Sequence, residues 1–169
     1  MSNRIDSIVT RGASTVKGVK ARFDKLVGVF NMLAEQHGAV SALMRCLQDR
    51  PEKKSDLWPE IRRELLTHEH GEICAVYPVL HDYGEMRPLV EQHAQEAGEM
   101  ESLIDEIDAA QAEDWRPLYD QLVDAVRHHV ELEETTIFPK AQQAIGDFVA
   151  KALEAKFLMA KNSALDDYQ

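Results

Sequence analysis

The sequence predicts an all-α protein, an antiparallel up-down four-helix bundle with an additional C-terminal helix. Four long stretches carry apolar residues three and four positions apart, which is the spacing of one helix face. No segment alternates apolar and polar residues as a strand does, and the connections between the stretches are short. A chain of 169 residues with 44% apolar content can bury one core without disulfides. We therefore expect a single domain over residues 1–169, with the bundle at about 20–145, a basic helical arm at 1–20 and a helical tail at 146–169.

The first two predicted helices each place polar residues in an otherwise apolar row. The row of the first helix is Phe23, Val27, Phe30, Ala34, His37, Ser41 and Met44. The connection QDRPEKKS breaks this pattern, and Ser55 can cap a second helix that has Pro59 near its first turn. The row of the second helix is Leu57, Ile61, Leu65, His68, Glu72, Ala75 and Val79. Histidine and glutamate are therefore expected to face the bundle axis.

The third and fourth predicted helices repeat this arrangement. Gly84 and Pro88 in the connection HDYGEMRP suit the end of one helix and the start of the next. The third row starts at Met86 or Leu89 and continues with His93, Ala97, Met100, Ile104 and Ile107. The fourth helix opens at Asp114 with Pro117 in its first turn, and its row is Leu118, Leu122, Ala125, His129, Glu133 and Thr136. From Ala141 we expect a shorter helix that covers one end of the bundle with Phe148, Leu153, Phe157 and Leu158.

One histidine from each row and one glutamate from the second and fourth rows form a candidate metal site. These six residues are His37, His68, Glu72, His93, His129 and Glu133. The chain contains an internal repeat, since EQH occurs at 35–37 and again at 91–93, each followed about one helix later by H-x-x-x-E. In both copies the glutamate precedes a proline, Pro78 or Pro139, by six positions. Two halves related by a pseudo-twofold axis predict two equivalent metal positions.

The residue types at this spacing fit metal binding for a direct physical reason. Residues four apart lie on one helix face, so an imidazole and a carboxylate can reach the same ion. Two buried glutamates without partners would be costly and would repel each other, and two divalent cations remove that penalty. The carboxylates can bridge both ions while two histidines hold each ion, which leaves positions for water, an oxo or hydroxo bridge, or a small ligand. A nitrogen and oxygen site of this kind suits iron, manganese or zinc, and spacing alone does not select the metal.

The other three histidines are interpreted as lying outside the site. His128 is about 100° around its helix from His129. His70 follows a predicted ligand by two positions and faces away, and His81 lies near a helix end. A lone histidine in an apolar row can also be a hydrogen-bonded core residue. The conjunction of four histidines and two glutamates in a two-fold register is what favours metal ligands here.

Three neighbours of the candidate ligands have a second interpretation. Glu69 and Glu134 are interpreted as solvated residues that could join the metal in some state. Tyr77 is interpreted as a core residue whose hydroxyl can donate a hydrogen bond at the site. Pro78 and Pro139 are interpreted as kinks or helix ends.

Several other classes of protein are disfavoured. The formal charge of -11 repels phosphate backbones, so nucleic acid is a poor partner. No stretch approaches the roughly 18 apolar residues of a membrane span. Cys46 and Cys74 have no C-x-x-C partner, which argues against a disulfide framework and fits a reducing cytoplasm. The Glu-x-x-His pair of ferritin-like bundles and the H-E-x-x-H zinc motif are also missing from the sequence.

The composite pattern H…HxxxE…H…HxxxE, with YP and FP closing the second and fourth helices, resembles the haemerythrin-like HHE cation-binding domain over roughly residues 20–145. The resemblance implies a non-haem di-iron centre, with two iron ions (Fe2+/Fe3+) and an oxo, hydroxo or water bridge, that binds dioxygen and related small molecules. It also implies that the four histidines are terminal ligands and that Glu72 and Glu133 are the bridging carboxylates.

The chain departs from the oxygen-carrying branch of that family. The carriers resemble H…HxxxE…HxxxH…HxxxxD, whereas here Ala97 stands four positions after His93, and Glu133 is followed by Glu134 rather than an aspartate. One histidine ligand is therefore missing. The missing ligand argues against reversible oxygen carriage, because a more exposed iron favours irreversible oxidation or reaction with peroxide or nitric oxide.

Three classes of function follow from this interpretation. The first is a di-iron protein that binds dioxygen, nitric oxide or peroxide for sensing, scavenging or iron handling. The second is an enzyme that turns over peroxide or nitric oxide, or supplies iron for the repair of iron-sulfur centres. The third is a helical interaction module without a metal. A signalling role would need a separate protein partner, for which the basic N-terminal arm and the C-terminal helix are candidate surfaces.

Overall fold

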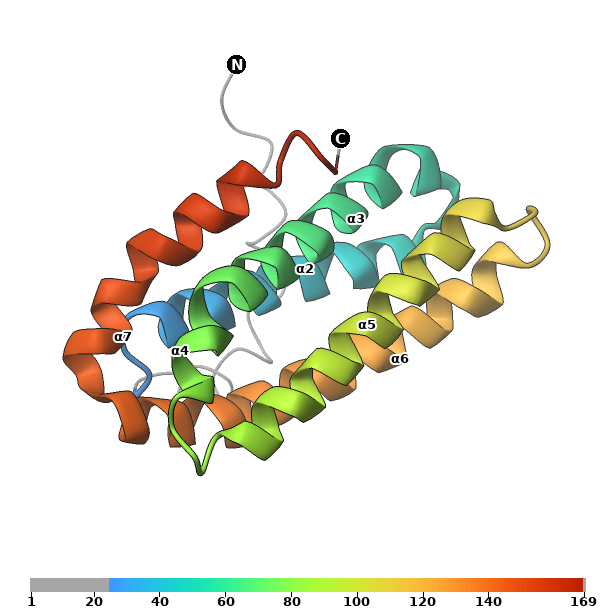
Figure 1. The fold of residues 1–169 in the computed structure, drawn as a ribbon. Coiled ribbons are helices and arrows are strands. Elements are labelled where there is room, and N and C mark those ends of the chain that lie inside the picture. The colour runs from blue at the N-terminus through green and yellow to red at the C-terminus, as the bar shows by residue number, and fades with distance from the viewer. Residues whose placement is uncertain (1–24, 169) are drawn as a thin grey trace, which may run out of the picture.

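The computed structural model describes residues 25–168, and within this range it contains helices and turns but no strand. The four main helices are α2 (Val29–Asp49), α3 (Lys54–Gly71), α5 (Arg87–Ala109) and α6 (Trp115–Leu132). They form an antiparallel up-down bundle, and α7 (Phe138–Ser163) packs against α2 and α3 (Figure 1). The predicted all-α bundle with an additional C-terminal helix is confirmed. The predicted basic arm at 1–20 and the predicted core residue Phe23 lie outside the described residues.

The chain entering α2 is tied to α7 by close backbone contact. Gly28 has a φ of 63°, in the left-handed region, and a Cβ atom there would lie 2.4 Å from the backbone of Ala150. Glycine suits both the conformation and this approach. The Val27 N–H donates to Oε1 of Gln142 at 2.7 Å, and Nε2 of Gln142 donates to the Lys25 carbonyl at 3.0 Å. The start of the bundle is therefore held against its C-terminal helix.

The second predicted helix begins differently from the expectation. A 3-10 turn at Pro51–Lys53 precedes α3, because the fixed φ of Pro51 already suits a helical first turn. Ser55 lies inside α3, and its hydroxyl donates to the Asp56 carboxylate at 3.4 Å instead of capping the helix. The predicted cap at Ser55 is therefore wrong.

Both halves of the repeat contain a π-helical segment that starts at the candidate glutamate. These segments are Glu72–Val76 and Glu133–Ile137. The N–H of Tyr77 donates to the carbonyl of Glu72, and the N–H of Phe138 donates to the carbonyl of Glu133, both five residues back. Each segment is followed by a proline in the first turn of the next helix, α4 (Tyr77–His81) or α7. The wider turn accommodates a residue that lacks an N–H and would crowd the carbonyl four residues back.

The π segments shift the buried face of the chain by one position. The predicted rows end at Val79 and Thr136, but both side chains are only half-buried. The next residues, Leu80 and Ile137, are fully buried instead. An extra residue in the turn moves every later side chain around the axis relative to an ideal α-helix. The prolines therefore mark a change of register within a continuing helix.

The C-terminal helix is longer than predicted. It begins at Phe138 rather than Ala141 and is bent at Gly146, whose φ is 78° and ψ is 162° (Figure 1). Of the four residues expected to cover the bundle, Leu153 and Phe157 are buried. Phe148 and Leu158 are 86% and 41% exposed, which contradicts their predicted role. The difference arises because Leu153 and Phe157, four apart, share the face that packs against α3, whereas the other two point elsewhere.

The core consists of two apolar clusters separated by the candidate site. One cluster includes Val29, Phe30, Leu33, Val76, Leu80, Met86, Ile137 and Phe138. The other includes Val40, Met44, Leu47, Ile61, Leu65, Met100, Ile104, Tyr119, Leu122 and Val126. Along α2, for example, Leu33 belongs to the first cluster and Val40 to the second, with His37 between them. None of the helices in the described part of the chain combines the length and apolar character needed to cross a membrane.

Candidate metal centre

The structure brings all six predicted site residues together between the two apolar clusters. His37 lies on α2, His68 in the last turn of α3, His93 on α5 and His129 in the last turn of α6, while Glu72 and Glu133 open the two π segments. Each of the six is at most 7% exposed. Such a concentration of buried ionisable groups requires mutual pairing or a bound cation.

The donor atoms fall into two groups that share one carboxylate. The first group is His37, His68, Glu72 and Glu133, and the second is Glu69, Glu72, His93 and His129. Within each group the donor atoms lie within 4.8 Å of one another. Each group could hold a cation, and Glu72 belongs to both groups.

Each of the two glutamates contacts histidines of both groups. Oε2 of Glu72 lies 3.5 Å from Nε2 of His68 and 3.4 Å from Nε2 of His93. Oε2 of Glu133 lies 3.2 Å from Nε2 of His37 and 3.5 Å from Nε2 of His129, while its Oε1 lies 3.3 Å from Nε2 of His93. Both carboxylates are therefore placed where one group could bridge two cations.

Glu69 belongs to the cluster as well, although the sequence suggested a solvated side chain. Its Oε1 lies 3.3 Å from Nε2 of His129, and its Oε2 lies 3.5 Å from Nε2 of His93. The Glu69 side chain is 14% exposed. A signal was present in the sequence, because Glu69 stands three positions before Glu72 and so shares its side of the helix.

Three of the four histidines are held from behind by a polar partner. Nδ1 of His37 lies 3.1 Å from Oε1 of Glu134, and Nδ1 of His129 lies 3.2 Å from Oε2 of Glu96. Nδ1 of His68 lies 3.1 Å from Oε1 of Gln36. An acceptor at Nδ1 keeps the proton on that nitrogen and leaves Nε2, which faces the cluster, free to bind a cation. Glu134 is therefore a partner of His37 and not a solvated neighbour.

The aromatic residue of each aromatic-proline pair stacks on a histidine. The Tyr77 ring lies 3.6 Å from the His93 ring between centroids, at 21°, and Phe138 lies 5.7 Å from His37 at 15°. The Tyr77 hydroxyl also donates to Oε1 of Glu133 at 2.5 Å. The repeat therefore extends to the stacking of an aromatic ring on a histidine in each half. Only Tyr77 has a hydroxyl group that can donate a hydrogen bond.

The acidic neighbours raise the pKa values of three histidines. Burial lowers the pKa of His37, but hydrogen bonds to Glu133 and Glu134 outweigh it and raise that pKa to about 10. In the same way, burial of His93 is outweighed by its hydrogen bonds to Glu133 and Glu72, which raise its pKa to about 11. Burial of His129 is outweighed by the charge of Glu133 and the hydrogen bond to Glu69, which raise its pKa to about 9. Without a cation, these three imidazoles carry the positive charge of the site.

The pKa values of the other three residues of the site are shifted in directions that depend on their partners. Burial and the charge of Glu133 raise the pKa of Glu72 to about 8. Burial opposes ionisation of Glu133 too, but the charge of His129 and the hydrogen bonds from His37 and His93 hold its pKa well below the ordinary value. Burial and the positive charge of His37 hold the pKa of His68 well below its ordinary value. Protons thus serve as the counter-charges that the carboxylates need.

The residues of the cluster do not provide hydrogen bonds for all of its buried polar atoms, and a bound cation would pair with those that remain. Among the described residues, four buried polar atoms of the site make no well-aligned hydrogen bond: Oε2 of Glu69, Oε1 of Glu72, Nε2 of His129 and Oε2 of Glu133. Three of them have only a charged neighbour at 3.2–3.5 Å. Buried polar atoms are normally paired, and an orphaned group calls for an ion or a water. Carboxylate oxygens and imidazole nitrogens are donors that suit iron, manganese or zinc.

The histidines that sequence analysis set aside lie away from the cluster. His128 and His81 are exposed. His70 is half-buried, with its Nε2 at 3.5 Å from Sγ of Cys74 and its ring against Tyr168. Their interpretation as residues outside the site agrees with these positions.

Most of the sequence matches a known protein family. The family described as Hemerythrin HHE cation binding domain matches residues 28–141, which is more than half of the chain. The matched range contains all six predicted site residues and Glu69. No match was found among curated proteins or among solved structures.

Proposed function

The chain belongs to the haemerythrin HHE cation-binding family, and from this premise we propose that it is a di-iron protein that binds dioxygen or a related small oxidant. The observation that carries the proposal is the pair of donor groups that share Glu72 and contain buried oxygen and nitrogen atoms without a well-aligned hydrogen bond. A cation at each group offsets the buried carboxylates and satisfies these atoms. The protein would use this binding for sensing, scavenging or iron handling.

The proposed ligands follow the two donor groups. His37 and His68 would hold one iron ion, and His93 and His129 would hold the other. Glu72 and Glu133 lie between the two positions, since each contacts histidines of both groups. When bound, the metal pair supplies redox-active Lewis acids beside the small ligand.

Glu69 changes the interpretation of the missing histidine. Ala97 is buried, and Ala97 and Glu69 line the same small cavity of about 90 Å³. Glu69 reaches both His93 and His129, so we propose that its carboxylate serves the second position in place of the histidine that the oxygen carriers possess. An additional anionic ligand stabilises ferric over ferrous iron, which agrees with reaction with an oxidant rather than reversible carriage.

The protein around the site orients the donor residues. The two apolar clusters flank the site, and the partners at Nδ1 fix the histidine rings. Tyr77 holds a proton at its hydroxyl against Glu133, and burial together with the charge of Glu133 raises its pKa well above the ordinary value. The phenol therefore keeps its proton at neutral pH and acts as a hydrogen-bond donor to Glu133.

The Tyr77 hydroxyl also favours a second candidate function, an enzyme that turns over peroxide or nitric oxide. A buried hydroxyl beside the site can donate a hydrogen bond to negative charge that develops on bound peroxide or nitric oxide. The two functions differ in stoichiometry. A sensor or scavenger consumes no more than a few oxidant molecules for each protein, whereas an enzyme continues to consume them.

Metal analysis of the freshly purified protein tests the proposal, combined with its absorption spectrum before and after anaerobic reduction. We expect two iron ions per chain and near-ultraviolet absorption that bleaches on reduction. Protein purified without metal, and unable to take up ferrous iron, would refute it.

The setting of the protein is part of this proposal. We propose a cytoplasmic location, which the free cysteines Cys46 and Cys74 support because the cytoplasm keeps thiols reduced. If the protein signals, it does so through a separate protein partner.

A further inference from the structure

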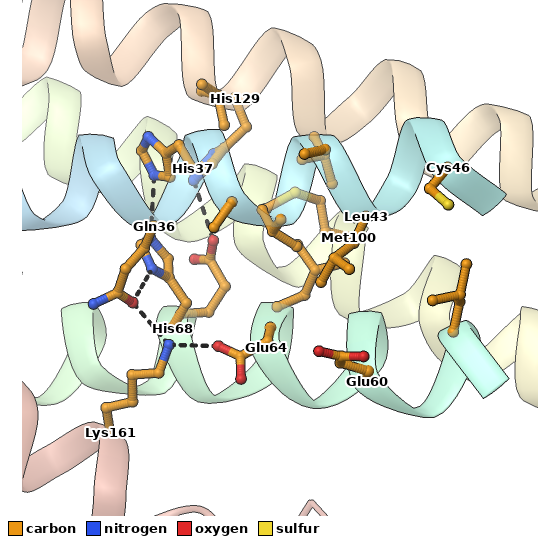
Figure 2. Close-up of a pocket in the computed structure, with 18 residues that line it drawn as sticks. Gln36, His37, Leu43, Cys46, Glu60, Glu64, His68, Met100, His129 and Lys161 are labelled. Carbon is orange, nitrogen blue, oxygen red and sulfur yellow. Dashed lines mark hydrogen bonds and ion pairs between the residues drawn. The ribbon is translucent and has the colours of Figure 1, made fainter. Parts of the chain in front are cut away.

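A cavity of about 470 Å³ extends from the candidate metal centre between α2 and α3 (Figure 2). At one end it is lined by His37, His68 and His129, and at the other by Cys46 and Leu57. Its floor is apolar and is formed by Val40, Leu43, Leu65, Met100, Val126 and Val130. Figure 2 shows Leu43 and Met100 between the histidines and Cys46, along the length of the cavity.

This cavity is larger than a diatomic oxidant or peroxide requires. Sites for organic ligands commonly enclose roughly 300–1,000 Å³ and combine an apolar lining with a few placed polar groups. The cavity lies within this range, and its apolar floor suits a hydrocarbon chain. Its size therefore indicates an organic ligand in addition to the small oxidant.

Of the three glutamates that line the cavity, Glu64 and Glu69 have positively charged partners among the described residues and Glu60 has none. Nζ of Lys161 lies 3.0 Å from Oε2 of Glu64 and 2.7 Å from Oε1 of Gln36, so this cation is already paired. Glu60 lines the cavity one helical turn away on α3, and it is half-buried. Within the described part of the chain, Glu60 has no hydrogen bond or ion pair. The cavity near Glu60 therefore favours a positively charged group and disfavours an anion.

We propose that the cavity binds an aliphatic amine, with its ammonium group at Glu60 and its chain on the apolar floor. The rise from Glu60 to His68 along α3 is about 12 Å, for eight residues at 1.5 Å each. An extended octyl chain is comparable in length, so its far end reaches the histidines. Binding in the cavity is independent of the metal, and only the placement of the chain end beside a metal pair rests on the proposed function.

Calorimetric titration of the full chain, as purified, with octylamine at pH 7 tests the proposal. We expect one octylamine per chain and at least tenfold weaker binding of octanoate, because Glu60 attracts an ammonium group and repels a carboxylate. Metal content is measured on the same sample. Octylamine binding by a protein that is purified without metal and cannot take up ferrous iron would overturn the proposed function and leave this inference standing.

Two variants locate the site. Glu60→Gln should reduce the preference for octylamine over octanoate about tenfold, whereas Glu106→Gln, an exposed glutamate on α5, should leave it unchanged. Ala42 is an exposed residue that lines the cavity, so Ala42→Trp should obstruct the cavity and weaken octylamine binding at least tenfold. Ala155→Trp, at an exposed alanine on α7 that does not line the cavity, should not. Neither Glu60 nor Ala42 belongs to the donor groups, so metal content should stay the same in both variants.

Three results would overturn the inference. They are failure of the unaltered protein to bind octylamine, octanoate binding as tight as octylamine binding, and octylamine binding by Ala42→Trp equal to that of the unaltered protein. If Ala42→Trp does not fold, Glu60→Gln decides alone, because an unchanged preference in that variant contradicts the ammonium site.

Discussion

Replacing Glu72 by glutamine removes a buried acid that the metal-free bundle has to keep protonated. The pKa of Glu72 is raised by burial and by Glu133 from an ordinary value of 4.5 to about 8. At pH 7 this carboxyl is therefore ionised in the unfolded chain and mostly protonated in the folded, metal-free chain. The folded state binds more protons than the unfolded state between these pKa values, so the stability of the metal-free protein falls as the pH rises through this window.

The size of the effect follows from the same values. The interval between the unfolded pKa of 4.5 and pH 7 is 2.5 pH units, and each unit corresponds to about 1.4 kcal/mol. The ionisable Glu72 therefore lowers the free energy of unfolding by about 3 kcal/mol at pH 7. Glutamine has the shape of a protonated glutamate and no acidic proton to lose. The metal-free Glu72→Gln variant should thus be more stable by about 3 kcal/mol at pH 7 and unchanged near pH 4. Its metal loading should fall, because a neutral amide does not offset the charge of a cation pair.

Urea unfolding of chelator-treated protein, followed by circular dichroism at pH 4 and pH 7, measures both parts of this prediction. Glu106→Gln, at an exposed glutamate, is the matched control and should leave the free energy of unfolding unchanged at both pH values. A Glu72→Gln variant less stable than the unaltered protein at pH 7 would refute the reasoning. So would a gain of equal size at both pH values.

The remaining predictions concern metal loading. His68→Ala and His129→Ala should each lose most of the bound metal while His70→Ala keeps it, and equal losses in metal analysis of the three would contradict the assignment. Glu134→Gln weakens the hold on His37 and should lower metal affinity about 10- to 100-fold in competition with a chelator, with unchanged affinity counting against this role. Since the pKa values of His37 and His129 are raised to about 10 and about 9, both must lose a proton to bind metal at pH 7. Loading should therefore release protons and tighten with rising pH, and a calorimetric enthalpy that is the same in buffers of different ionisation enthalpy would exclude this.

The placement of the six candidate ligands could be predicted because each interrupts an apolar row at a repeated distance. The contacts that support them could not. Gln36 and its repeat counterpart Gln92 occupy equivalent positions, yet Gln36 meets His68 whereas Gln92 donates to Glu96. Glu96 in turn reaches His129. The repeat therefore extends to the candidate ligands but not to these supporting contacts, which depend on distances between helices that a single row does not encode.

The fold was predictable up to the points where helical geometry departs from the ideal. The spacing of three and four identified the main helices, but it assumes 3.6 residues per turn throughout. The π segments break that assumption at Glu72 and Glu133, which explains why Leu80 and Ile137 replace the expected inward residues. On α6, the stacked rings of Trp115 and Tyr119 are also buried beside the expected row.

The division of the core into two apolar clusters separates the residues that hold the bundle together from the residues of the candidate metal centre. Each end of the molecule has its own hydrocarbon packing, so the charged layer between them does not have to supply cohesion. Donor residues in that layer are therefore free to vary in number and type while both ends stay packed. Such an arrangement tolerates changes in the donor residues without loss of packing, and the proposed role of Glu69 beside Ala97 would be one such change.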